Sequence, residues 1–296
     1  MNELLYIVED SLTGLLTGGI YALMAVGMVL VFKATRVVNF AHGTIMMVGT
    51  YFFFSFSLLV QQLGLSFWVS VPLALLSTGL LGMFLERVLM RPLLGQSVFS
   101  MIMVTVALIS VLEGLTILIW TSDAQYPPGL FSLQISFIWE AAVNMQLFWG
   151  FVIALSLFVL ISIVLFLTRI GVALRATASD QATAYSMGIN VPGVFGMTWM
   201  VAAMTGCLAG ILLAPLNSLT PSLGHLGLSV LAVIILGGLD SLLGTLIAAL
   251  LIGWLEAMTG HFLGGDYREV MPYIVVLLII VIRPYGLFGS KEVERI

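Results

Sequence analysis

Long apolar stretches separated by short polar ones form the dominant pattern of the chain. Five runs of more than 20 residues contain no Asp, Glu, Lys or Arg, at residues 11–32, 37–85, 92–112, 141–168 and 181–239. A helix that spans a bilayer needs about 20 mostly apolar residues, so two of these runs can hold more than one span. A β-barrel would instead show segments of about 10 alternating residues. The pattern predicts an all-α polytopic membrane protein with a single transmembrane domain over 1–296.

We expect eight or nine membrane segments. The nine apolar segments are 11–32, 37–59, 67–90, 98–121, 147–168, 193–215, 226–239, 241–258 and 270–283. The segment at 226–239 would be about 21 Å long as a helix, which is short of a hydrocarbon core of about 30 Å. It and the next segment are therefore either two thin spans or a re-entrant pair of broken helices. The last segment is also short.

Basic residues predict the orientation, because Lys and Arg concentrate in cytoplasmic loops. They follow the first, third, fifth and last segments, as Lys33, Arg36, Arg87, Arg91, Arg169, Arg175, Arg283, Lys291 and Arg295. The intervening gaps at 60–66, 122–146 and 216–225 contain none, and Arg268 is the exception. We therefore expect the N-terminus outside and the C-terminus in the cytoplasm. The N-terminus has no basic residue, so 11–32 is expected to be a retained span rather than a secretory signal.

Composition and motifs limit the classes of function that the chain can have. Of the 296 residues 61% are hydrophobic and 8% are charged, against about 25% charged in soluble domains. The sequence has no Walker A motif, no nucleophile elbow and no His, Cys, Asp and Glu cluster with metal-ligand spacing. We therefore expect no catalytic residues, no metal site, no cofactor in this chain and no nucleic-acid binding.

The longest polar island lies at 169–192. Thr177 precedes Asp180 at the spacing of a capping box, Gly188 can form a left-handed helix end, and Pro192 is expected to prevent the helix from resuming. These start and stop signals predict a short helix over about 177–189 on the cytoplasmic surface. Ala178, Ala182, Tyr185 and Ile189 would share one apolar face, available to a partner. The alternative is an ordinary loop between two spans.

Two interrupted stretches place small and hydrogen-bonding residues inside apolar segments, one in each half of the chain. The first contains Asn39, His42, Gly43 and Thr44, and the second contains Gly237, Gly238 and Asp240. Broken helices at matching places in two pseudo-repeated halves indicate a translocation site. The alternative is close helix packing through small residues, which we favour for Gly43, Gly49 and Gly244.

Two further features concern the outer side. The connection at 122–146 alternates apolar and polar residues from Phe131 to Phe137, which predicts an extended element. It is either a contact site for a soluble partner or a loop packed on its own spans. Glu113 is a carboxylate within a predicted span, which allows an ion-coupled carrier as an alternative function.

Four groups of residues, taken in order and spacing, resemble a known family. They are Thr35 to Gly43, Leu174 to Asp180 with Gly188 to Asn190, Leu236 to Gly238, and Arg283 to Gly289. Together they resemble the LivH-type permeases of branched-chain amino-acid ABC importers, over nearly the whole chain.

The resemblance implies a multi-pass protein of the bacterial cytoplasmic (inner) membrane. It also implies a second, homologous permease subunit, two cytoplasmic ATPase subunits that bind ATP and Mg, and an extracytoplasmic substrate-binding protein. The helix at 177–189 would be the coupling helix. Its coupling residues would be Arg175, Asp180, Ala182, Tyr185, Gly188 and Ile189.

The sequence departs from the family pattern at three positions of the interrupted stretches. Thr44 stands where the family usually has Glu, Asp240 stands where it usually has Gly, and Leu243 stands where a Pro is common. These changes bear on the substrate more than on the fold. Importers of urea and short-chain amides share the architecture, so urea, short-chain amides or other small carboxylates are the alternative substrates.

Overall fold

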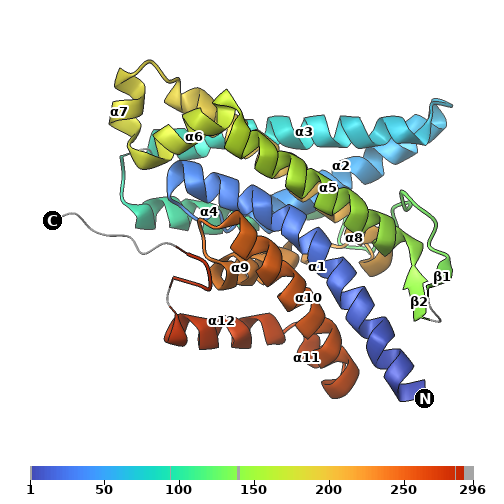
Figure 1. The fold of residues 1–296 in the computed structure, drawn as a ribbon. Coiled ribbons are helices and arrows are strands. Elements are labelled where there is room, and N and C mark those ends of the chain that lie inside the picture. Colours follow the sequence, from blue (N-terminus) through green and yellow to red (C-terminus); the bar gives the residue numbers. More distant parts are fainter. Residues whose placement is uncertain (1, 94, 139–140, 284, 290–296) are drawn as a thin grey trace. The chain divides into compact units, whose positions relative to one another are not determined.

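The computed structural model describes residues 2–93, 95–138, 141–283 and 285–289 (Figure 1). Its long helices are α1 (Asn2–Thr35), α2 (His42–Gln62), α3 (Ser70–Leu85), α4 (Val98–Trp120), α5 (Met145–Leu167), α8 (Val191–Asn217) and α10 (Leu242–Leu263). Its shorter helices are α6 (Arg169–Ser179), α7 (Gln181–Ser186), α9 (Leu226–Gly237), α11 (Gly265–Arg268) and α12 (Met271–Ile282). Pro284, Lys291 and Arg295, used above for the family motif and the orientation, lie outside the described residues.

Single turns extend or precede some of these helices. A 3-10 turn, η1 (Phe67–Val69), leads into α3. A π-helical turn, η2 (Glu86–Met90), and a 3-10 turn, η3 (Arg91–Leu93), follow it. A 3-10 turn, η4 (Pro221–His225), leads into α9.

Seven helices among the described residues are long and apolar enough to cross a membrane. They are α1, α2, α3 with its flanking turns, α4, α5, α8 and α10. Helices α9 and α12 have 12 residues each, or about 18 Å, which is short of a hydrocarbon core of about 30 Å. Each of the nine predicted segments overlaps one of these nine helices. The prediction of an all-α polytopic membrane protein with some short helices is therefore confirmed.

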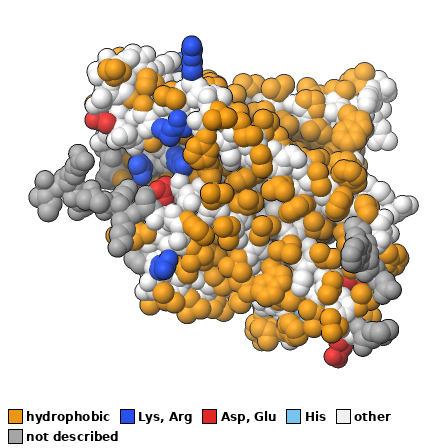
Figure 2. Space-filling model, viewed as in Figure 1, with side chains coloured by type: hydrophobic (Ala, Val, Ile, Leu, Met, Phe, Trp, Pro, Cys, Tyr) orange, Lys and Arg blue, Asp and Glu red, His pale blue; other side chains and the backbone are white. Residues whose placement is uncertain are grey.

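Much of the surface is apolar. Only 22% of the apolar stretch of α4 and 17% of that of α5 is buried, and apolar side chains cover much of the face in Figure 2. A soluble monomer rarely exposes so large an apolar area. Lipid or another membrane subunit is expected to cover these two helices.

The chain forms two compact units, each built from separate stretches. Unit 1 comprises Met1–Val29, Phe131–Phe158 and Ser229–Ile296, and unit 2 comprises Leu30–Leu130 and Val159–Leu228. The units therefore do not correspond to an N-terminal and a C-terminal half. The pseudo-repeat of two halves stays a prediction.

Helices α2, α3 and α8 pack against one another to form the core of unit 2. Glycine permits their close packing: a Cβ on Gly49 would lie 2.7 Å from Oγ1 of Thr78 and 2.8 Å from Cβ of Cys207. Both distances are shorter than a van der Waals contact. The packing role that we favoured for Gly49 is confirmed.

The neighbours along α2 and α8 show that these helices run in the same direction. His42 lies beside Gly206, and one turn later Met46 lies beside Gly210. Because His42 is the first residue of α2 and Gly206 lies midway along α8, α2 begins beside the middle of α8. The predicted topology gives segments 37–59 and 193–215 this same relative direction.

Unit 1 is built around α1 and α10, which run antiparallel. Gly14 of α1 packs on Gly253 of α10, and one turn later Gly18 packs on Ala249. The hydroxyl of Tyr21 in α1 donates a hydrogen bond to Oε2 of Glu256 in α10 (2.9 Å). Both of these side chains are buried. The pairing satisfies a carboxyl group that would be costly to bury alone.

The expected extended element is a β-hairpin in unit 1. Strand β1 (Ile135–Ile138) pairs antiparallel with β2 (Ala141–Asn144), so the strand begins later than the alternation predicted, and α5 follows directly. Phe137 is exposed, whereas Val143 of β2 is buried. The hairpin is held to α1, because the backbone N–H of Ala142 donates to Oε1 of Glu9 (2.7 Å).

Candidate functional site: the coupling segment and the pathway residues

The polar island at 169–192, which we call the coupling segment, is fixed to its unit by arginine side chains. Arg175 of α6 donates a hydrogen bond to the carbonyl of Leu165 near the end of α5. Arg36, just after α1, donates to the carbonyl of Ala178 (3.4 Å). Arg175 was predicted to act in coupling, and the structure places it as a tether between α5 and α6.

The predicted helix over 177–189 is wrong in its boundaries, because the segment contains two helices that meet at Asp180. Thr177 lies buried inside α6 and does not cap a helix. Asp180 is instead the N-cap of α7: its carboxylate accepts hydrogen bonds from the N–H groups of Ala182 (2.8 Å) and Thr183 (3.1 Å) and from the hydroxyl of Thr183 (2.8 Å). These bonds, above all that from the Thr183 hydroxyl, lower the pKa of Asp180.

The end of α7 confirms one prediction and corrects another. Gly188 has φ +84°, and its N–H donates to the carbonyl of Tyr185 (3.0 Å), so it forms the left-handed end that we expected. Pro192 does not prevent a helix from resuming. It lies in the first turn of α8, where a proline is tolerated because no partner exists for an N–H there.

Helix α7 presents apolar side chains to solvent. Tyr185 is 71% exposed and Met187, just after the helix, is 79% exposed, whereas Ala184 is buried. The predicted apolar face is therefore only partly right: Ala182 and Tyr185 are exposed, Ile189 is half-buried, and Ala178 belongs to α6. Sequence reasoning missed Met187, because the single-helix interpretation placed it off the face.

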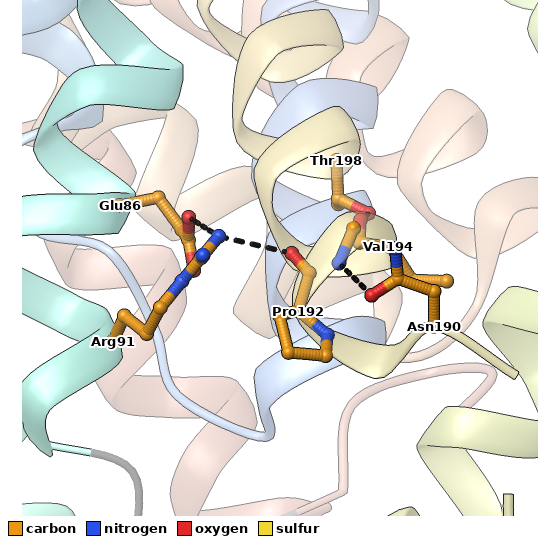
Figure 3. A network of polar contacts seen from close by, with 7 residues as sticks. Glu86, Arg91, Asn190, Pro192, Val194 and Thr198 are labelled. Atoms are coloured by element: carbon orange, nitrogen blue, oxygen red, sulfur yellow. Dashed lines mark hydrogen bonds and ion pairs between the residues drawn. The ribbon is translucent and has the colours of Figure 1, made fainter. Parts of the chain in front are cut away.

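An ion pair connects the turns η2 and η3, which follow α3, to the end of the coupling segment (Figure 3). The carboxylate of Glu86 accepts two hydrogen bonds from Arg91, at 3.1 Å from Nε and 2.7 Å from Nη2. The same Nη2 donates to the carbonyl of Pro192 (3.1 Å). The side chain of Glu86 is 2% exposed and that of Arg91 is 32% exposed. We call this arrangement the Glu86–Arg91 strut, and sequence reasoning missed it.

Positive charge gathers around the coupling segment. Arg36 and Arg91 reach it through the hydrogen bonds above, and Arg169 and Arg175 belong to it. Several Lys and Arg side chains appear in Figure 2 where Figure 1 places α6 and α7. Cations at one set of helix ends are typical of the cytoplasmic side of a membrane protein.

The first set of predicted pathway residues lies at the start of α2 in unit 2. Asn39 is buried and its side-chain oxygen accepts a hydrogen bond from the N–H of Ala41 (3.0 Å). A Cβ on Gly43 would lie 2.6 Å from Cα of Gly227, so Gly43 serves close packing, as we favoured. His42 and Thr44 are buried on the same turn.

The second set lies in unit 1, where α9 ends and α10 begins. Gly237 and Gly244 touch through their backbones, since a Cβ on Gly237 would lie 2.5 Å from the carbonyl of Gly244. Gly238 turns the chain with φ +101°, and Asp240 is partly exposed in this turn. The first set belongs to unit 2 and the second set to unit 1.

The glycine-rich motif near the C-terminus completes this same turn. The N–H of Leu287 donates to the carbonyl of Leu236 (2.8 Å), and that of Phe288 donates to the carbonyl of Gly237 (3.2 Å). These bonds satisfy carbonyls at the C-terminal end of α9, which a helix leaves without partners of its own. Two motifs that are far apart in the sequence thus form one substructure.

Glu113, the carboxylate that suggested an ion-coupled carrier, lies beside a histidine. Its Oε1 is 3.7 Å from Nε2 of His225, and the His225 side chain is 67% exposed. The carboxylate therefore lies next to an accessible polar group. A carrier that uses a proton site would be favoured by an isolated charge deep in a span. Glu113 is not isolated in this way, because His225 lies beside it.

Comparisons with known proteins identify the family. The family model described as "Branched-chain amino acid transport system / permease component" matches residues 11–281. The high-affinity branched-chain amino acid transport system permease protein BraD of Pseudomonas aeruginosa is 29% identical, over 100% of both chains. LivH of Salmonella typhimurium is 28% identical, over 100% of this chain and 99% of its own.

Two further comparisons concern the sequence and the fold. A probable LivH permease of Methanocaldococcus jannaschii is 28% identical, over 93% of this chain and 90% of its own. The solved structure of PsaBC from Streptococcus pneumoniae in complex with Fab has a similar fold, with a TM-score of 0.50 at 15% identity, over 92% of this chain and 91% of that one. With a family match across nearly its whole length, the chain belongs to the permease components of branched-chain amino acid transport systems.

Proposed function

We propose that this protein is the permease subunit of an ABC importer that moves branched-chain or related hydrophobic amino acids across the cytoplasmic membrane. Two partner ATPase subunits bind ATP and Mg and hydrolyse the ATP, a second homologous permease completes the membrane part, and an extracytoplasmic binding protein delivers the substrate. The N-terminus is outside and the C-terminus is cytoplasmic. Family membership and the names of the full-length relatives support this proposal.

One observation carries the coupling role: α7 is a short capped helix that presents Tyr185 and Met187 to solvent. Exposed aromatic and methionine side chains at the core of an interface contribute much of its binding energy. Because Asp180 and Gly188 fix both ends of α7, the helix can transmit a displacement of its partner to α6 and α8. Arg175, Ala182 and Ile189 support this element.

The test removes the apolar contact. Tyr185→Asp is expected to weaken binding of the ATPase subunits by about 2 kcal/mol, roughly thirtyfold, and to abolish substrate-stimulated ATP hydrolysis in the reconstituted complex. Co-purification of the ATPase subunits and hydrolysis rates measure the two effects. Tyr126→Asp is the matched control for co-purification, since Tyr126 is similarly exposed (77%) but lies in the connection predicted to be outside.

A backbone variant tests the same element. Gly188→Pro cannot adopt φ +84° and lacks the N–H that bonds Tyr185, so it should also uncouple hydrolysis from substrate. Gly64→Pro is its control: Gly64 has φ +66° in the turn between α2 and α3, at the other end of unit 2. Undiminished stimulation in both Tyr185→Asp and Gly188→Pro would refute the coupling role.

We also propose that Asn39, His42, Gly43, Thr44, Gly237, Gly238 and Asp240 form or shape the substrate pathway. The motivation is their place at two helix breaks, where backbone groups can meet a polar substrate. Asp240→Asn should lower amino-acid uptake by about tenfold, equivalent to ~1.4 kcal/mol on the barrier, while the ATPase subunits still co-purify. Normal uptake in Asp240→Asn and His42→Ala together would argue against the pathway.

A further inference from the structure

An apolar groove in unit 2 lies beside the coupling segment. It has a volume of about 660 Å³ and is formed by the second half of α5, by α6 and by the first half of α8. Leu160 and Val164 of α5, Ala173 of α6 and Met197 of α8 are among the side chains that line it. Leu160 and Met197 are also exposed, so the groove opens onto the apolar surface that faces the bilayer.

One end of the groove is polar and positively charged. Arg169 and Asn190 line it where α5 passes into α6 and where α8 begins. The Asn190 side-chain oxygen already accepts a bond from the N–H of Gly193 (3.1 Å). Arg169 is exposed and has no ion pair or side-chain hydrogen bond within the part of the chain that the structure describes, and no Asp or Glu is among the lining residues.

The length of the groove fits one leaflet. From Asn190 to Val201 it follows α8 for about three turns, or roughly 16 Å at 1.5 Å per residue. Half of the hydrocarbon core is about 15 Å thick. Since Arg169 and Asn190 lie at helix ends and Val201 lies within a span, the groove runs from the membrane interface towards the middle of the bilayer.

We propose that this groove binds one phospholipid with an anionic headgroup. An acyl chain lies along α5 and α8, and Arg169 holds the phosphate and the negative headgroup. The single uncompensated cation at the interfacial end of an apolar channel is the complement of such a lipid. Because α6 forms one wall, the bound lipid links α5, α6 and α8 next to the coupling segment. This inference does not depend on the transported substrate.

The test uses the full-length chain in mild detergent and native mass spectrometry, with palmitoyl-oleoyl phosphatidylglycerol and phosphatidylcholine as probes. One Arg contributes about a fivefold preference for the anionic lipid. We expect that preference in the wild type and its loss in Arg169→Gln. Arg87→Gln is the matched control, because Arg87 is an exposed cation in η2 and does not line the groove.

A second pair of variants tests the channel itself. Ala173→Phe should fill the groove and reduce the bound fraction of both lipids, whereas Val172→Phe, on the exposed side of α6, should not. Equal preference in the wild type and in Arg169→Gln, or unchanged binding in Ala173→Phe, would overturn the proposal. So would displacement of the lipid by palmitate at equal concentration, which would indicate a fatty-acid site. Disulfide capture of another transporter subunit at Met197→Cys would indicate a protein interface instead.

Discussion

Asp180 and Gly188 show how single residues define the coupling segment. Asp180 ends one helix and caps the next, and Gly188 ends that second helix in a left-handed conformation. The two residues fix the ends of α7, which exposes Tyr185, with Met187 exposed just after it. In the proposed function, coupling depends on this backbone geometry rather than on reactive side chains.

A comparison of two glycines tests the turn between α9 and α10. Gly238 (φ +101°) and Gly264 (φ +102°) have nearly the same backbone conformation. A Cβ on Gly238 would lie 2.7 Å from Cα of Gly289, whereas one on Gly264 meets no described atom within 4 Å. Gly264→Ala should cost only the conformational penalty of about 1–2 kcal/mol.

Gly238→Ala carries that penalty and a collision with backbone in addition, so it should be clearly less stable than Gly264→Ala. The midpoint of thermal unfolding in detergent measures both variants. Equal midpoints would mean that the segment around Gly289 does not pack on the end of α9. The C-terminal motif would then not stabilise the turn between α9 and α10.

Helices were the part of the fold that the sequence could predict, because apolar length alone identifies a span. All nine apolar segments contain helices. The break at Asp180 could not be predicted, since Thr177 and Asp180 are both good capping residues. Arg36 donates a hydrogen bond to the carbonyl of Ala178 in α6, and this contact joins residues far apart in the sequence. Arg175 donates to the carbonyl of Leu165 in α5, a backbone acceptor that no side-chain pattern indicates.

The candidate site was predictable only in part, for the same reason. Gly188 could be placed by its chemistry, because few other residues adopt a positive φ. The Glu86–Arg91 strut could not, because its third member, the Pro192 carbonyl, is distant in sequence and belongs to the backbone. A glutamate within an apolar stretch, with an arginine five residues later, was the one signal that could have indicated a buried pair.

The strut yields a prediction about how α3 and α8 are held together. Arg91→Met would leave the buried Glu86 carboxylate unpaired, and breaking a buried pair costs about 3–5 kcal/mol. We expect the low end of that range, because the Arg91 side chain is partly exposed. Arg91→Lys keeps the charge but not the two-pronged geometry, so it should fall between Arg91→Met and wild type.

A double-mutant cycle separates the pair from its surroundings. Glu86→Gln combined with Arg91→Met should be more stable than the sum of the single changes predicts, because no unpaired charge remains buried. Arg87→Met, which removes an exposed cation next to the pair, serves as control and should be close to neutral. Purely additive effects would show that the strut contributes nothing as a unit.

At the scale of the whole molecule, the positions of cations and the directions of helices bear on orientation. Helices α2 and α8 run in the same direction, and Arg36, Arg91, Arg169 and Arg175 gather around the segment that precedes α8. Positive residues are retained on the cytoplasmic side. We therefore expect the coupling segment in the cytoplasm and the β-hairpin outside.

Cysteine labelling measures this orientation directly. Ser179 and Ser132 are both exposed, at the end of α6 and before β1 respectively, and the native Cys207 is buried and should react little. A membrane-impermeant maleimide added to intact cells should label Ser132→Cys, and should label Ser179→Cys only after the membrane is opened. The wild-type chain is the control for Cys207. Labelling of both positions from the same side would place the coupling segment beyond the reach of any cytoplasmic ATPase and would refute the proposed mechanism of energy transfer.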